Sequence, residues 1–124
     1  MKFLSILFTV LFLSFSASAY ELLMFSIKSC HYCIAFMEQV EPEYHDTEYA
    51  ETLPLTIIDN ADIPEWFHIA YDKGDIKKIK GTPTFIIWDE ENQIEIDRIV
   101  GYGGKEWFYE QISIRVKHLN NNEE

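Results

Sequence analysis

The two cysteines of this chain, Cys30 and Cys33, are separated by only two residues and follow a short apolar run. They are the only cysteines among the 124 residues, so any chemistry that needs a thiol must use this pair. If the pair lies at the start of a helix, the unpaired backbone N–H groups and the positive end of that helix favour the thiolate form of the first cysteine. Such a pair can serve as a structural disulfide, as part of a metal site, or as a carrier of electrons.

The spacing favours the last of these interpretations. A disulfide stabilises a fold mainly by constraining a long loop in the unfolded chain, and a ring that encloses two residues constrains little. Structural zinc needs four ligands, and the chain has neither a second cysteine pair nor histidines at a zinc-binding spacing. In thiol–disulfide exchange, Cys30 would be the nucleophile and Cys33 the resolving thiol. A soft-metal module that holds Cu(I) through Cys30 and Cys33, with or without His31, is the alternative from another functional class.

The N-terminus has the pattern of a secretion signal. Lys2 precedes an apolar run over 3–15, and Ala17-Ser18-Ala19 has the small-x-small form that signal peptidase accepts. The run is shorter than the ~20 apolar residues of a spanning helix. The sequence therefore predicts a cleaved signal peptide over 1–19 and one domain over 20–124, with an uncleaved anchor as the alternative. Export permits disulfides, and in a bacterium with an outer membrane it predicts a periplasmic location.

The charge of the chain excludes some partners. A net charge of −11 argues against binding to nucleic acid or to anionic lipid, both of which need clustered cations. The local exception is the group Lys73, Lys77, Lys78 and Lys80. This group either steers an acidic partner or provides only solubility and helix-end charge.

The hydrophobic pattern predicts an α/β fold. Its elements come in the order strand, helix, strand, helix, strand, strand, helix, over 22–25, 30–40, 53–58, 63–71, 84–88, 93–100 and 105–119. Ser29 is the expected N-cap of the first helix, and Pro42 is expected to bend or end it. A strand–helix–strand unit followed by a hairpin and a closing helix predicts a mixed sheet covered on both faces.

The segment Ile79-Lys-Gly-Thr-Pro-Thr-Phe85, about 50 residues after the cysteines, makes the redox interpretation more specific. Together with the Cys-x-x-Cys motif, it resembles the thioredoxin superfamily. The resemblance implies a minimal thioredoxin fold, a four-stranded mixed sheet without the extra N-terminal strand and helix. It also implies a cis bond between Thr82 and Pro83 that leaves the backbone of Thr82 free to pair with a partner strand. An ordinary proline at the entry to a strand is the alternative for Pro83.

A narrower match covers most of residues 20–124. The chain is similar to the periplasmic thioredoxin-like proteins encoded with bacterial sulfur-oxidation (Sox) systems. The matching segments are Met24-Phe25, Ser29–Cys33, Glu41–Tyr44, Thr47-Glu48, Leu53–Leu55, Thr82–Phe85, Arg98–Gly104 and Trp107-Phe108.

That similarity implies a reductase acting on a protein thiol or disulfide. It would keep a cysteine of the sulfur-carrier protein reactive, and a membrane thiol–disulfide transporter would supply its electrons. We expect a monomer with no cofactor beyond the Cys30–Cys33 disulfide. A reductase for cytochrome c maturation and a disulfide isomerase are the alternatives within enzymes, although an isomerase commonly needs a dimerisation domain.

The sequence departs from the thioredoxin pattern at the site. Met24 stands where many thioredoxins have a buried aspartate that assists proton transfer, and Ser29 stands where many have tryptophan. The inner pair is His31-Tyr32, which we assign a supporting role. A protonated His31 would favour the thiolate of Cys30 and a more oxidising disulfide, unless its ring simply faces solvent.

Two carboxylates of the first helix region bear on the missing aspartate. Glu38 and Glu41 could replace it as a proton relay, or they could belong to an ordinary solvated helix face.

Overall fold

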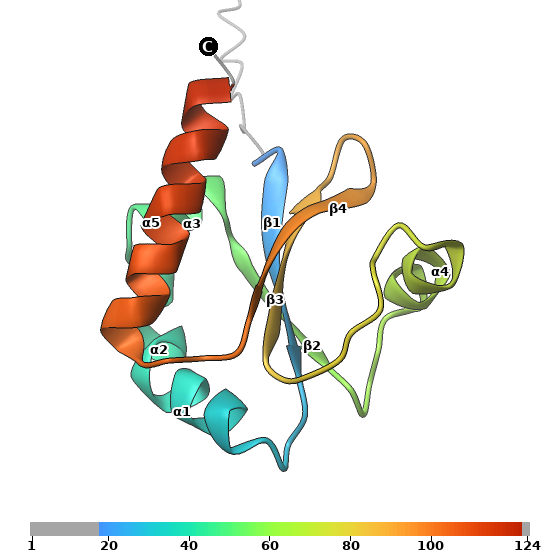
Figure 1. Ribbon diagram of the computed structural model, residues 1–124, viewed down its shortest axis with the longest axis horizontal. Coiled ribbons are helices and arrows are strands. Elements are labelled where there is room, and N and C mark those ends of the chain that lie inside the picture. Colours follow the sequence, from blue (N-terminus) through green and yellow to red (C-terminus); the bar gives the residue numbers. More distant parts are fainter. Residues whose placement is uncertain (1–17, 123–124) are drawn as a thin grey trace, which may run out of the picture.

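A mixed sheet of four strands forms the centre of the computed structural model, which describes residues 18–122 (Figure 1). Most of the predicted signal peptide, residues 1–17, lies outside the described part of the chain. The elements are β1 (Tyr20–Ser26), α1 (His31–Gln39), α2 (Glu41–Tyr44), α3 (Tyr49–Thr52), β2 (Leu55–Asp59), α4 (Glu65–Lys73), β3 (Thr84–Asp89), β4 (Ile94–Val100) and α5 (Lys105–Asn122).

The strands lie in the order β2-β1-β3-β4. β1 pairs with β2 in parallel and with β3 in antiparallel orientation, and β4 continues the hairpin from β3. In this register Phe25, near the end of β1, lies opposite Ile58 and Thr84. The predicted fold class is confirmed, and the register brings the segment after β1 and the segment before β3 to the same end of the sheet.

Both faces of the sheet are covered, as Figure 1 shows: α1, α2, α3 and α5 lie on one side and α4 on the other. Leu22 and Met24 of β1 belong to the core under α1 and α5, whereas Leu23 between them belongs to the core under α4. Phe85 and Ile86 of β3 divide between the two cores in the same way. Central strands buried on both faces read as unbroken apolar runs, which explains the pattern seen in the sequence.

Three predicted details need correction. The N-cap of α1 is Cys30 and not Ser29, because the sulfur of Cys30 accepts the N–H that a capping side chain should accept. α4 begins at Glu65, two residues later than predicted, because Pro64 has the extended backbone of an N-cap residue. The sequence prediction also missed the single-turn helices α2 and α3, which are too short to show helical periodicity.

The end of the first helix is as predicted. α1 stops at Gln39, and the chain turns at Val40 into α2, where Pro42 occupies the first turn. Proline fits there because first-turn N–H groups have no partner within the helix. Among residues 18–122, no helix has the length and apolar character needed to cross a membrane.

Candidate redox site

Cys30 is positioned by the start of α1. Its backbone is extended, as an N-cap requires, and its Sγ accepts a hydrogen bond from the backbone N–H of Cys33 at 3.1 Å. The N–H of Ile34 then bonds to the carbonyl oxygen of Cys30 at 3.1 Å and begins the helical ladder. The sulfur therefore lies against the positive end of a helix with an N–H directed at it, an arrangement that stabilises a thiolate.

Cys30 and Cys33 form a disulfide, with their Cα atoms 5.2 Å apart. The two sulfurs differ in access. Cys33 is 1% exposed and belongs to the core under α1, whereas Cys30 is half-buried at the rim of that core. Cys30 is therefore the more accessible of the two sulfur-bearing residues.

The loop before β3 approaches the same end of the sheet (Figure 1). The Thr82–Pro83 peptide bond is cis, and Pro83 is buried. The loop is held by two hydrogen bonds: the carbonyl oxygen of Pro83 accepts from the N–H of Gly101 at 2.8 Å, and Oγ1 of Thr84 donates to the carbonyl oxygen of Gly81 at 2.7 Å. The side chain that follows, Phe85, packs on Phe36 of α1 with ring centroids 4.9 Å apart. This contact ties the loop to the helix that carries the cysteines.

Thr82 has backbone groups that no neighbour satisfies. Within residues 18–122, neither its N–H nor its carbonyl oxygen makes a hydrogen bond. Backbone polar groups in folded proteins are nearly always paired, and a half-buried unpaired residue at the edge of a site is suited to bind an extended segment of another chain.

His31 and Tyr32 lie on the outer surface of α1. The Tyr32 side chain is 59% exposed, and the His31 ring contacts it edge-on at 5.9 Å between centroids. Within the described residues His31 has no hydrogen-bond partner. The structure thus places both residues beside the cysteines in sequence, on the exposed surface of α1.

A pocket of about 440 Å³ adjoins Cys33 on the side of β2. Its lining includes two carboxylates, Glu38 of α1 and Asp59 at the end of β2. Met24 is fully buried, so no carboxylate reaches Cys33 from that position of β1. Glu41 is half-buried at the start of α2 and does not line this pocket.

Sequence reasoning missed Asp59. Its position at the carboxyl end of the strand beside β1 was the available signal, because parallel neighbours end at the same edge of a sheet.

In the part of the chain that the structure describes, no three or more His, Cys, Asp or Glu side chains come together as metal ligands would. Copper binding by the cysteine pair with His31 is a matter for a competition titration with a copper chelator.

No protein-family model and no curated protein matches the sequence, but solved structures of other proteins share its fold. Among solved structures, the periplasmic thioredoxin SoxS from Paracoccus pantotrophus matches with a TM-score of 0.63 and 22% identity, over 79% of this chain and 96% of that one. This chain has the thioredoxin fold. The thioredoxin Mala s 13 of Malassezia sympodialis also matches, with a TM-score of 0.60 and 19% identity over 80% of this chain and 79% of that one.

A third match widens the range of proteins with this thioredoxin fold. The C-terminal domain of DsbD from Neisseria meningitidis has a TM-score of 0.51 and 19% identity, over 77% of this chain and 80% of that one. At these identities the likeness concerns the fold. The resemblance predicted from the sequence is confirmed at that level, and a thioredoxin fold with a Cys30–Cys33 disulfide at the start of α1 supports a thiol–disulfide oxidoreductase.

Proposed function

We propose that this protein is an exported thiol–disulfide oxidoreductase that reduces a disulfide of a partner protein. The observation that carries the proposal is the placement of Cys30, which caps α1 with its sulfur and is bonded to the buried Cys33. The cis Thr82–Pro83 loop at the same end of the sheet supports it by providing unpaired backbone groups for a partner strand.

The reaction starts from the reduced protein. The Cys30 thiolate attacks one sulfur of the partner disulfide, a Cys30–partner S–S bond forms, and the partner's other sulfur leaves as a thiolate that takes up a proton. Cys33 then loses its proton and attacks the sulfur of Cys30. This step closes the Cys30–Cys33 disulfide and releases the second partner thiolate, which is also protonated. Two electrons have passed from the protein to the partner, and of the two protons that the partner takes up, one is balanced by the proton that Cys33 loses and one comes from solvent, so the proposal calls for no further cofactor.

The proton of Cys33 needs an acceptor, because a buried thiol attacks poorly until it is ionised. Glu38 and Asp59 line the pocket that adjoins Cys33 and are the carboxylates available to accept that proton or pass it to water. In this role they would replace the buried aspartate that many thioredoxins have at the position of Met24.

The partner that we propose is the sulfur-carrier protein of a Sox system, in the periplasm, with a membrane thiol–disulfide transporter as electron donor. Support comes from the sequence motifs shared with Sox-associated proteins and from the structural match to a periplasmic thioredoxin named SoxS. A monomer suffices for this reaction, because one chain contains both cysteines. A reductase for cytochrome c maturation would use the same site chemistry.

The first experiment is the redox equilibrium of the Cys30–Cys33 pair against the glutathione couple. A potential well below that of glutathione is the expected result and identifies a reductant. A strongly oxidising value would reverse the proposed direction of electron flow and would assign the protein to disulfide formation.

Trapping identifies the partner. A Cys33→Ser variant cannot resolve the mixed disulfide, so the partner should stay bonded to Cys30 and be released by dithiothreitol. The Cys30→Ser variant is the matched control and should trap nothing. Equal capture by both variants would contradict the assignment of Cys30 as the nucleophile.

A further inference from the structure

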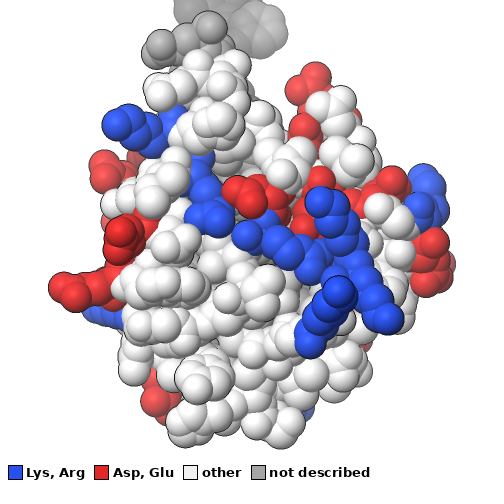
Figure 2. All heavy atoms as spheres, in the orientation of Figure 1, with Lys and Arg blue, Asp and Glu red and all other residues white. Residues whose placement is uncertain are grey.

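A basic segment leads from α4 to the loop of Pro83. Four of the chain's ten lysines and arginines lie at positions 73–80, in a protein with twenty-one acidic residues. Figure 2 shows the result as a group of blue side chains, right of centre, over the segment that follows α4. The surface below this group, toward the end of the sheet that carries the cysteines in Figure 1, is mainly uncharged.

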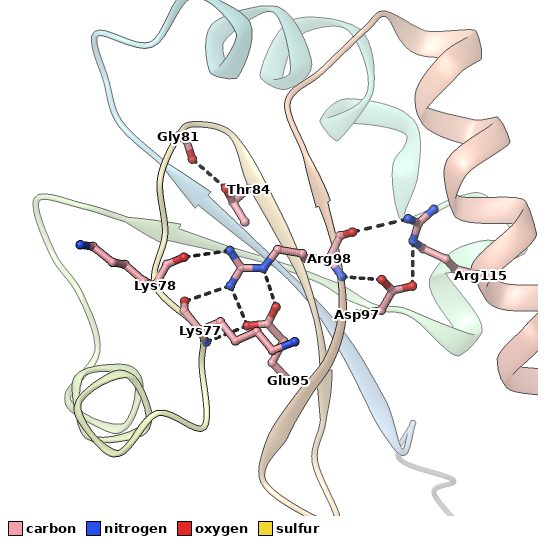
Figure 3. A network of polar contacts seen from close by, with 8 residues as sticks. All are labelled: Lys77, Lys78, Gly81, Thr84, Glu95, Asp97, Arg98 and Arg115. Carbon is pink, nitrogen blue, oxygen red and sulfur yellow. Dashed lines mark hydrogen bonds and ion pairs between the residues drawn. The ribbon is translucent and has the colours of Figure 1, made fainter.

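The backbone of this segment is held by an ion pair between Glu95 and Arg98 on β4 (Figure 3). Nε of Arg98 donates to Oε2 of Glu95 at 2.6 Å, and its Nη2 donates to Oε1 at 2.7 Å. The same guanidinium donates to the carbonyl oxygens of Lys77 and Lys78, at 2.9 and 3.1 Å. The N–H of Lys77 closes the network by donating to Oε1 of Glu95 at 2.9 Å.

Three of the five hydrogen bonds in this network involve backbone atoms of Lys77 or Lys78. The Glu95 side chain is only 2% exposed, and its hydrogen bonds to Arg98 raise the pKa of that guanidinium despite partial burial. Next along the segment, Ile79 packs against the core under α4. The segment from Lys77 to Ile79 is therefore fixed in place by polar contacts and by apolar packing.

Three of the four lysine ammonium groups, in contrast, have no partner among the described residues. Lys73 forms an ion pair with Asp75 at 3.6 Å, but the side chains of Lys77, Lys78 and Lys80 have no hydrogen bond or ion pair with any residue between 18 and 122. All three side chains are exposed. A rigid backbone that presents three unpaired cations is preorganised for an anionic partner, because little ordering of the segment is needed on binding.

This surface lies close to the redox site. Lys80 precedes Pro83 by three residues, a span of at most about 11 Å in an extended chain. The register of β1 with β3 places the end of that span beside the segment that leads to Cys30. A partner segment paired with the backbone of Thr82 would therefore extend over Lys80 or toward it.

We propose that Lys77, Lys78 and Lys80 form a docking surface for an acidic segment of the partner protein, next to the disulfide that Cys30 attacks. The inference rests on the proposed disulfide exchange and specifies its substrate class. The negative charge of the whole chain does not oppose this docking at physiological salt, since charges beyond about 8 Å are largely screened there. A docked segment would therefore interact mainly with the charges of the unpaired lysines.

The test uses three synthetic peptides that carry the same disulfide, with flanking residues that are glutamate, glutamine or lysine. Their second-order reduction rates by the reduced protein are measured at about 0.1 M and at about 0.5 M NaCl. Each rate is divided by the rate with 2-hydroxyethyl disulfide, which is small and uncharged. We expect the glutamate peptide to react about tenfold faster than the lysine peptide at the lower salt concentration, and this preference to shrink at the higher one.

Substitutions locate the effect. Lys80→Glu should reduce the preference for the glutamate peptide several-fold, and the K77E/K78E/K80E variant should reverse it. Lys117→Glu is the matched control, because Lys117 is an exposed lysine near the end of α5, and it should keep the wild-type preference. If the triple variant unfolds, the comparison of Lys80→Glu with Lys117→Glu and the salt dependence of the wild type still decide the question.

The outcomes separate the two proposals. Failure to reduce even 2-hydroxyethyl disulfide would overturn the proposed function. Normal reduction of that compound with equal rates for the three peptides would overturn the docking surface alone. A charge preference that Lys117→Glu alters as much as Lys80→Glu would also overturn it, because the general charge of the protein would then be responsible.

Discussion

Cys30 combines two tasks that are usually given to different side chains. Its sulfur satisfies the N–H of Cys33 as an N-cap, and the same sulfur is the one that a partner disulfide can reach. The hydrogen bond that stabilises the helix start also stabilises the charged form of the nucleophile. Local folding and reactivity therefore depend on the same atom.

This dual role predicts a difference between two substitutions of Cys30. Both Cys30→Ser and Cys30→Ala remove the disulfide, but serine is a good N-cap and alanine is a poor one. We expect Cys30→Ala to unfold with a free energy about 1 kcal/mol lower than Cys30→Ser, measured by urea denaturation under reducing conditions. Equal stabilities would show that the cap bond seen for the sulfur contributes nothing to the helix.

Glu90, in the β3–β4 turn, predicts a pH dependence of stability. A hydrogen bond with the Glu21 carboxyl, assisted by partial burial, raises the pKa of Glu90 from 4.5 to about 7. Glu21 itself accepts a hydrogen bond from Oγ1 of Thr56. Because the folded state binds the proton more tightly than the unfolded state, this contribution is fully present below about pH 4.5 and is lost as the pH rises through about 7.

Glu90→Gln should therefore flatten the fall in unfolding free energy between these pH values and leave the variant more stable than wild type above about pH 7. Urea denaturation across this range measures the effect. Glu91→Gln removes one charge from the same turn and is the control. If the unfolding free energy of Glu90→Gln falls with pH as steeply as that of wild type, the proton is not shared with Glu21 in the folded protein.

β4 illustrates which parts of the structure its sequence could and could not predict. The unbroken apolar runs of β1 and β3 predict those strands correctly, since both are buried on two faces. In β4, hydrophobicity alone would place Ile94 and Ile96 in the core, yet each is 44% exposed while Glu95 between them is 7% exposed. The burial of Glu95 depends on Arg98 and on the backbone of Lys77, eighteen residues away in the chain, and no local pattern reports such a contact.

The features of the candidate site likewise divide into those that the sequence predicts and those that only the structure shows. The cysteine spacing predicts the disulfide pair, and the resemblance to thioredoxins indicates the loop of Pro83. The unpaired backbone of Thr82 and the pocket shared by Cys33 and Asp59 required the sheet register, which brings separate strand ends together.

The ion pair between Glu95 and Arg98 provides a test of how β4 supports the basic segment. Arg98→Ala would leave the buried carboxylate of Glu95 with only the N–H of Lys77 as a donor, and we expect a loss of about 2–3 kcal/mol in unfolding free energy. Adding Glu95→Gln should restore part of that loss, because the remaining group is neutral. A double variant that is less stable than Arg98→Ala would contradict the view that an unpaired charge causes the loss.

The whole chain presents two electrostatic features of opposite sign. Its net charge of −11 creates self-repulsion in the folded state, while the three unpaired lysines form a local positive surface. Salt screens both, so it should act in opposite directions on two measurements. Raising the salt concentration relieves self-repulsion and stabilises the fold, but it weakens the attraction between the lysines and an acidic partner.

The expected effect of salt on the stability of the fold can be tested without a partner. Between about 0.05 M and about 0.5 M NaCl, we expect the midpoint of thermal unfolding to rise by about 3 °C. A variant with Glu51→Gln, Asp72→Asn and Glu110→Gln removes three negative charges from exposed positions on three different helices. Its midpoint should be higher than that of wild type at the lower salt concentration and should respond less to added salt. If the midpoint of wild type falls with salt instead, favourable ion pairs outweigh self-repulsion, and the pairs Lys73–Asp75 and Arg115–Asp97 become the contacts to remove next.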